Sequence, residues 1–143
     1  MFLTSLQVFL SLLFICSATL FADDLIDVKE IALKKDEQKK ILVKYDGKTR
    51  LFQFRWTLYV NEGLVVLRSY DKQVAQNILY LNHKNQSFRV VLKTPGADFY
   101  NVPYMLIKFK EFDFKNNKAL FVVYISDNKQ QIVLEILENK NKR

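Results

Sequence analysis

Apolar and polar side chains alternate along most of this chain, most clearly in the stretch from Arg50 to Tyr70. Every second position from 52 to 60 is apolar, in the order Phe52, Phe54, Trp56, Leu58 and Val60. Successive side chains of a β-strand point to opposite faces, so this spacing predicts a strand with one apolar face. We interpret that face as one wall of the core, or as the lining of an apolar cavity if the core is hollow. The lining residues would be Phe52, Phe54, Trp56 and Leu58.

The same alternation, or a short apolar run between turn residues, recurs along the chain. The predicted strands cover residues 28–34, 39–45, 49–60, 64–70, 73–81, 87–93, 104–112, 118–126 and 131–138. Short links between consecutive strands favour antiparallel neighbours, so we predict an all-β antiparallel meander of about eight or nine strands. Such a meander folds as a sandwich or as an up-and-down barrel, and the sequence leaves both open.

Turn residues separate the predicted strands. Gly47 follows Asp46 between two alternating segments, and a two-residue type I′ turn needs positive φ at both of these central positions. Gly63 in "VNEGL" and Gly96 in "TPGAD" mark two further turns. Residues 23–40 and 69–83 also carry some helical spacing, but we interpret both segments as mainly strand.

The predicted strands differ in how many of their faces are apolar. Residues 87–93 and 104–112 have one apolar face and one basic face, which is typical of strands with a solvated outer side. The run from Ala119 to Ser126 is apolar on both faces. We therefore place this run in the centre of a sheet, or beneath another element or a partner.

The N-terminal segment indicates export. Residues 1–22 contain no charged side chain, and residues 8–21 are mostly Leu, Phe and Ile. This segment resembles a secretory signal peptide with cleavage after Ala22. We predict a cleaved signal peptide over residues 1–22 and a single β-rich exported domain over residues 23–143. A retained anchor that ties the domain to the membrane, and a lipoprotein modified at Cys16, are the alternatives.

Cysteine usage favours the bacterial periplasm. Cys16 is the only cysteine, and it would leave with the signal peptide. The exported domain would then contain no disulfide, thiolate zinc site or cysteine nucleophile. Small eukaryotic extracellular domains usually carry disulfides, so we expect a periplasmic protein.

The charge balance favours anionic partners. The chain has 22 Lys and Arg against 15 Asp and Glu, a formal net charge of +7. We expect an envelope protein or an anionic surface component, such as phospholipid headgroups or lipopolysaccharide. Export makes nucleic acid the least suitable of the anionic partners. The alternative is that the charge serves solubility alone.

The sequence offers little for catalysis. His83 is the only histidine and lies in a polar link, so a Ser–His–Asp arrangement would depend on it. We find no clustered metal ligands and no glycine-rich phosphate loop. We therefore predict a protein that is not an enzyme and that has no cofactor and no metal.

Binding has more support. The longest irregular segment runs from residue 93 to residue 104 and contains both prolines and three aromatic residues. Aromatic side chains on stiff loops make good anchors. Arg55 and Tyr59 are four residues apart on one predicted strand, so we place them on the same polar face, opposite Trp56. The predicted contact set is Arg55, Tyr59, Arg68, Phe99, Tyr100 and Tyr104.

These observations favour a non-enzymatic binding or assembly accessory of the bacterial cell envelope. The alternative is a lipocalin-like carrier that holds an apolar small molecule inside a barrel. A hydrolase of envelope glycans or lipids comes third, since paired carboxylates on opposing strands leave no linear motif.

Overall fold

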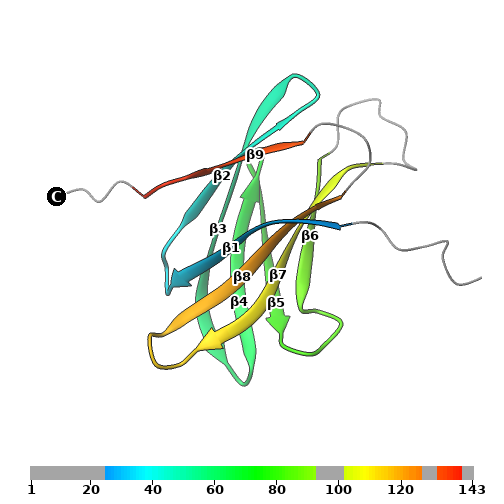
Figure 1. Ribbon diagram of the computed structural model, residues 1–143. Coiled ribbons are helices and arrows are strands. Elements are labelled where there is room, and N and C mark those ends of the chain that lie inside the picture. The colour runs from blue at the N-terminus through cyan, green and yellow to red at the C-terminus, as the bar shows by residue number, and fades with distance from the viewer. Residues whose placement is uncertain (1–24, 93–101, 127–131, 140–143) are drawn as a thin grey trace, which may run out of the picture.

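The computed structural model describes residues 25–92, 102–126 and 132–139, which contain nine strands and no helix (Figure 1). The strands are β1 (Leu25–Lys34), β2 (Lys39–Tyr45), β3 (Lys48–Val60), β4 (Gly63–Tyr70), β5 (Gln73–Tyr80), β6 (Ser87–Val91), β7 (Tyr104–Asp113), β8 (Lys118–Ser126) and β9 (Val133–Leu137). Each of the nine predicted strands is present, and both ambiguous segments are mainly strand where the structure describes them. The prediction of an all-β fold is confirmed for the described residues.

The strands form two antiparallel sheets that face each other as a sandwich. One sheet has the order β1-β8-β7-β6, and the other has the order β5-β4-β3-β2-β9. Strands β2 to β5 and strands β6 to β8 are two meanders, but the links β1–β2, β5–β6 and β8–β9 pass from one sheet to the other. Because the chain changes sheet at these links, the described strands form two layers and not one closed meander.

Strand β8 lies between β1 and β7, so the prediction of a central strand is confirmed. On its inner face Ala119, Phe121 and Val123 are fully buried, and Val122 on its outer face is only 6% exposed. An ion pair of 2.9 Å joins Lys110 of β7 to Glu30 of β1. These two strands flank β8, so the paired side chains cross over its outer face. Their aliphatic stems can cover apolar surface there.

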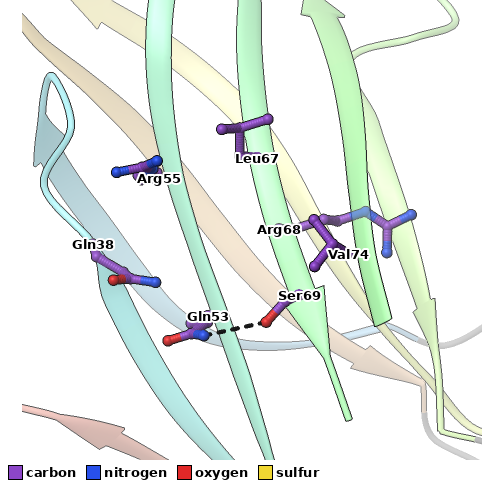
Figure 2. Close-up of a pocket in the computed structure, with 7 residues that line it drawn as sticks. All are labelled: Gln38, Gln53, Arg55, Leu67, Arg68, Ser69 and Val74. Atoms are coloured by element: carbon purple, nitrogen blue, oxygen red, sulfur yellow. Dashed lines mark hydrogen bonds between the residues drawn. The ribbon is translucent and has the colours of Figure 1, made fainter. Parts of the chain in front are cut away.

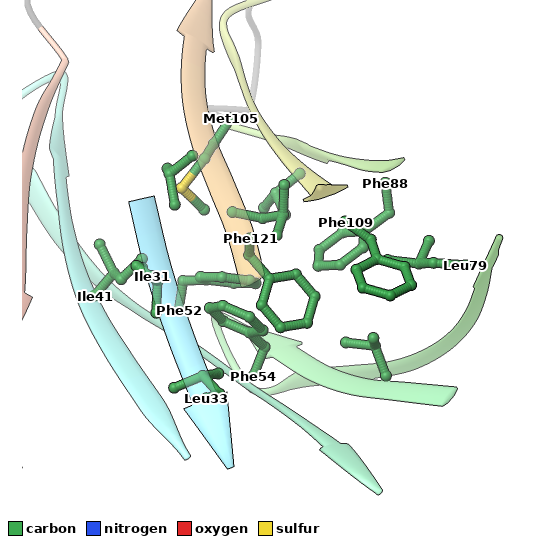
Figure 3. Packing of buried hydrophobic residues seen from close by; sticks show 14 of the residues in the cluster. Ile31, Leu33, Ile41, Phe52, Phe54, Leu79, Phe88, Met105, Phe109 and Phe121 are labelled. Atoms are coloured by element: carbon green, nitrogen blue, oxygen red, sulfur yellow. The ribbon is translucent and has the colours of Figure 1, made fainter. Parts of the chain in front are cut away.

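Aromatic side chains from both sheets fill the core (Figure 3). Phe52 and Phe54 of β3 lie with ring centroids 5.5 Å apart, and Phe54 meets Phe121 of β8 edge-on at 5.2 Å. Phe52 also contacts Phe88 of β6, at 6.3 Å between centroids. Contacts of this geometry add to the stabilisation that burial alone provides. The two sheets are therefore joined by rings that pack directly against one another.

Two-residue turns connect the hairpins β2–β3, β3–β4 and β4–β5. The predicted turn at Asp46 and Gly47 is confirmed, because φ is 53° and 68° at these positions. The other two turns also have positive φ at both central residues: Asn61 (50°), Glu62 (65°), Asp71 (49°) and Lys72 (67°). All three turns thus meet the requirement of type I′ for positive φ at both positions.

Gly63 follows its turn and is the first residue of β4. A Cβ added there would lie 3.0 Å from the ring of Tyr80 and 3.1 Å from Ile78. The glycine therefore allows a close approach of the Tyr80 ring to the backbone of β4.

The prediction that positions 52 to 60 share one face is wrong beyond Trp56. Phe52, Phe54 and Trp56 are at most 2% exposed, but Leu58 is 47% exposed and Val60 is 53% exposed. The pairing of β3 with β4 shifts register between Trp56 and Leu58. The extra residue of this bulge is Thr57, which reverses the alternation, so the last part of β3 presents its apolar residues to solvent.

Candidate binding site

An open hollow of about 270 Å³ lies on the outer face of the five-stranded sheet, the face turned away from the core (Figure 2). Strands β3, β4 and β5 and the β1–β2 link supply its lining: Gln38, Gln53, Arg55, Leu67, Arg68, Ser69 and Val74. These side chains offer amide, hydroxyl and guanidinium groups, and none of them is a carboxylate. A hollow of this chemistry suits an anionic or hydroxyl-rich group.

Strand register explains why the polar side chains meet here. Lys40 of β2 pairs with Gln53 of β3, and Gln53 pairs with Ser69 of β4. Directly paired residues lie on the same face of a sheet, so these three side chains form one row. Gln53 donates a hydrogen bond of 3.3 Å from Nε2 to Oγ of Ser69. The Ser69 hydroxyl proton remains able to donate to a ligand.

Arg55 supplies the exposed charge of the hollow. It pairs in register with Leu67 and is exposed to solvent. Its guanidinium makes no hydrogen bond or ion pair within the described residues. A planar guanidinium can hold a carboxylate or phosphate through two parallel hydrogen bonds. The predicted role of Arg55 as a contact residue therefore has a suitable setting.

The guanidinium of Arg68 points to the other side of the same sheet. Arg68 follows the buried residues Leu64 and Val66 at alternate positions of β4. Its guanidinium lies 4.8 Å from the centroid of the Phe88 ring, and its Nε donates a hydrogen bond of 2.7 Å to Oδ1 of Asn77. Burial lowers the pKa of the Arg68 guanidinium. The structure thus separates the charges of Arg55 and Arg68, which the predicted contact set placed together.

Tyr59 does not share a face with Arg55, so that prediction is wrong. The bulge at Thr57 turns Tyr59 toward the core, where its ring stacks on Phe112 at 4.2 Å and an interplanar angle of 15°. Tyr59 also meets Phe109 edge-on at 6.1 Å. Its ring therefore extends the aromatic packing between the sheets.

Tyr104 lies in the other sheet, at the start of β7. It is 7% exposed, and the guanidinium of Arg89 lies 3.9 Å from the centroid of its ring. Tyr104 is thus distant from Arg55 in the topology and largely covered. Phe99 and Tyr100, the other two predicted loop anchors, lie outside the described residues.

A second hollow of about 350 Å³ lies at the end of the sandwich beside the β7–β8 turn. Its lining is mostly aromatic and apolar: Lys35, Trp56, Leu58, Tyr59, Phe112, Phe114 and Asn117. Phe114 is 76% exposed, and its ring meets that of Phe112 at 4.9 Å. Phe112 and Phe114 were not among the predicted site residues, although the alternating "FDF" at 112–114 was the available signal.

The described residues contain no group of three His, Cys, Asp or Glu side chains that could hold a metal ion. His83 is exposed in the β5–β6 link, where its ring meets that of Tyr80 at 5.9 Å between centroids. The same part of the chain contains no helix that is long and apolar enough to span a membrane. The expectations of no metal and no catalysis stay predictions.

No family model, curated protein or solved structure matches this chain.

Proposed function

We propose that this protein is an exported, non-enzymatic binding accessory of the bacterial cell envelope that acts in the periplasm. In this proposal it docks an anionic component, namely anionic phospholipid headgroups, on the outer face of the five-stranded sheet. The observation that carries the proposal is the exposed guanidinium of Arg55, which has no partner in the described structure, in a hollow without a carboxylate.

Apolar side chains beside the hollow support a lipid surface as the binding partner. Leu58, Val65 and Ile78 are aligned across β3, β4 and β5 on the same outer face. Leu58 is 47% exposed and Ile78 is 45% exposed. Peripheral proteins bind anionic membranes by combining basic side chains at the headgroups with apolar side chains at the acyl boundary. Arg55 and the Leu58–Val65–Ile78 row offer this combination.

The net charge of +7 adds a weaker, long-range attraction to an anionic surface. This attraction falls off within a Debye length of about 8 Å at physiological salt. Binding to headgroups through Arg55 should therefore weaken as salt is added, while the apolar contribution should persist.

Vesicle co-sedimentation tests the proposal. Protein expressed from its full coding sequence is mixed with phosphatidylcholine vesicles, with and without phosphatidylglycerol, at low and high salt. We expect binding only to the anionic vesicles, and Arg55→Glu should lower the partition coefficient by roughly tenfold or more. Lys115→Glu makes the same charge change in the β7–β8 turn, away from the hollow, and is the matched control.

Two results would overturn the proposal. One is equal binding to vesicles with and without phosphatidylglycerol. The other is an equal loss of binding in Arg55→Glu and Lys115→Glu, since a non-specific effect of net charge would then explain the attraction.

A further inference from the structure

Strand β5 differs from the other edge strands of the described sheets. The four edge strands are β1 and β6 in one sheet and β5 and β9 in the other. Exposed edges invite pairing with another chain, and proteins protect them with charges, bulges, proline or short length. Strand β1 has four charged residues and a register shift. Strands β6 and β9 are each only five residues long, and each contains one charged residue.

Strand β5 has none of these protections. Its eight residues, "QVAQNILY", include no charged residue and no proline, and its pairing with β4 runs without a register shift. Val74 is 79% exposed and Ile78 is 45% exposed. A long, regular, uncharged edge of this kind is a site where another strand can add.

The turns at both ends of β5 show which backbone groups point away from β4. The two-residue turn at 71–72 closes on the pair Tyr70 and Gln73, so Gln73 bonds toward β4. At the other end, the Tyr80 N–H donates to the Asn85 carbonyl at 3.0 Å and not to β4. The backbone N–H and C=O groups of successive residues in a strand point to opposite sides, so those of Val74, Gln76 and Ile78 point away from β4.

We propose that β5 pairs with β5 of a second copy of this chain, antiparallel and centred on Gln76. Gln76 then lies opposite the partner's Gln76, and Val74 lies opposite the partner's Ile78. Each of the three pairs joins two outward-pointing residues, which gives about six hydrogen bonds. The two five-stranded sheets become one continuous sheet with a twofold axis through its centre.

The sequence of β5 favours this register over its neighbours. Centring on Gln76 sets an apolar side chain opposite an apolar side chain twice, on the outer face. A register centred on Ala75 sets Gln76 opposite the partner's Val74, and one centred on Asn77 sets Gln76 opposite the partner's Ile78. Both registers also pair fewer of the backbone groups that point away from β4. The register centred on Gln76 also keeps Lys72 opposite the partner's Tyr80, so like charges do not meet.

The dimer would strengthen the proposed membrane binding, but the inference of a dimer does not depend on that function. A twofold axis normal to the sheet keeps both outer faces on one side. The two β3 strands are then five strand spacings apart, roughly 24 Å. If the Arg55 hollow binds headgroups, the dimer presents two such hollows to one surface and gains avidity.

Sedimentation velocity of protein expressed from its full coding sequence tests the dimer. Gln76→Lys and Gln76→Glu each set two like charges opposite one another, and each should raise the dimer dissociation constant by roughly tenfold or more. An equimolar mixture of the two variants should restore a dimer, because opposite charges then meet. Ala32→Lys, at an exposed position of the other sheet, should dimerise as the wild type does.

Several results would overturn the inference. A wild-type chain that stays monomeric up to its solubility limit excludes a second copy as the occupant of this edge. If Gln76→Lys has the same dimer dissociation constant as the wild type, the interface lies elsewhere on the molecule. A mixture that stays monomeric contradicts the register centred on Gln76. Circular dichroism of each variant confirms that the fold is intact, since the Gln76 side chain is exposed.

Discussion

Trp56 and Leu33 are joined by a hydrogen bond that crosses the sandwich. The indole Nε1 of Trp56, on β3, donates to the backbone carbonyl oxygen of Leu33, on β1, at 2.8 Å. Both residues are at most 2% exposed. In this setting the bond satisfies the indole donor of a fully buried Trp and fixes β3 against β1.

Replacement of Trp56 by Phe should therefore destabilise the protein. The substitution removes the donor, leaves the Leu33 carbonyl without this partner and opens a gap at the ring. We expect the free energy of unfolding to fall by roughly 2–4 kcal/mol, measured by urea titration with circular dichroism. Phe52→Leu also removes part of a buried ring but no hydrogen bond, and should cost less. Equal losses in the two variants would show that the hydrogen bond contributes nothing.

Gly63 should be essential for the position of Tyr80. A methyl group at residue 63 would meet the Tyr80 ring at 3.0 Å, which is tighter than nine in ten Cβ contacts, so the ring must give by a few tenths of an ångström. We expect Gly63→Ala to lower the free energy of unfolding by roughly 1–3 kcal/mol. Tyr80→Ala removes the obstacle, so the double variant should be more stable than the sum of the single effects predicts. Additive effects in this cycle would contradict the steric explanation.

Lys72 in the β4–β5 turn is a position where glycine should stabilise the fold. Lys72 has φ of 67°, and a non-glycine residue in this left-handed region carries strain. Lys72→Gly should raise the free energy of unfolding by up to roughly 1 kcal/mol, after the extra entropy of glycine in the unfolded chain is subtracted. Gln73→Gly, one residue further along in regular strand, should instead lower it. Loss of stability in Lys72→Gly would show that the turn is not strained.

Much of the fold could be predicted from the sequence because alternation and turn chemistry are local properties. Asp46 and Gly47 identified the β2–β3 turn, and the apolar run in β8 identified a central strand. The choice of two sheets could not be predicted, because the β5–β6 link, which changes sheet, is short and polar and so resembles the link of a hairpin. Link length does not tell whether the next strand pairs with the previous one.

The candidate site was harder to predict for a different reason. One extra residue at Thr57 reverses the faces of all later residues in β3, and nothing in the local composition marks it. The inward direction of Arg68 was predictable, however, because Leu64, Val66 and Arg68 alternate on one face. The predicted contact set placed Arg68 on the binding surface, whereas its guanidinium lies over Phe88.

Asp113 should stabilise the β7–β8 turn in a manner that depends on pH. Its Oδ1 accepts a hydrogen bond from the Asn116 N–H at 3.1 Å, and its Oδ2 accepts one from Nδ2 of Asn116 at 2.8 Å. These hydrogen bonds to the ionised carboxylate lower the pKa of Asp113 below its ordinary value. A carboxyl group whose pKa is lower in the folded state stabilises the fold above the unfolded pKa, and this contribution is lost as pH falls through the folded pKa.

Thermal unfolding of wild type and Asp113→Ala across an acid series measures this contribution. At pH 7 the variant should melt at a lower temperature than the wild type. The difference should shrink as pH falls below about 3.9, the ordinary pKa of aspartate. Glu111→Ala removes a neighbouring exposed carboxylate that makes no such hydrogen bonds in the described structure, so its effect should be smaller at every pH. A difference for Asp113→Ala that is constant from neutral to strongly acidic pH would mean that the charge of the carboxylate does not matter to the turn.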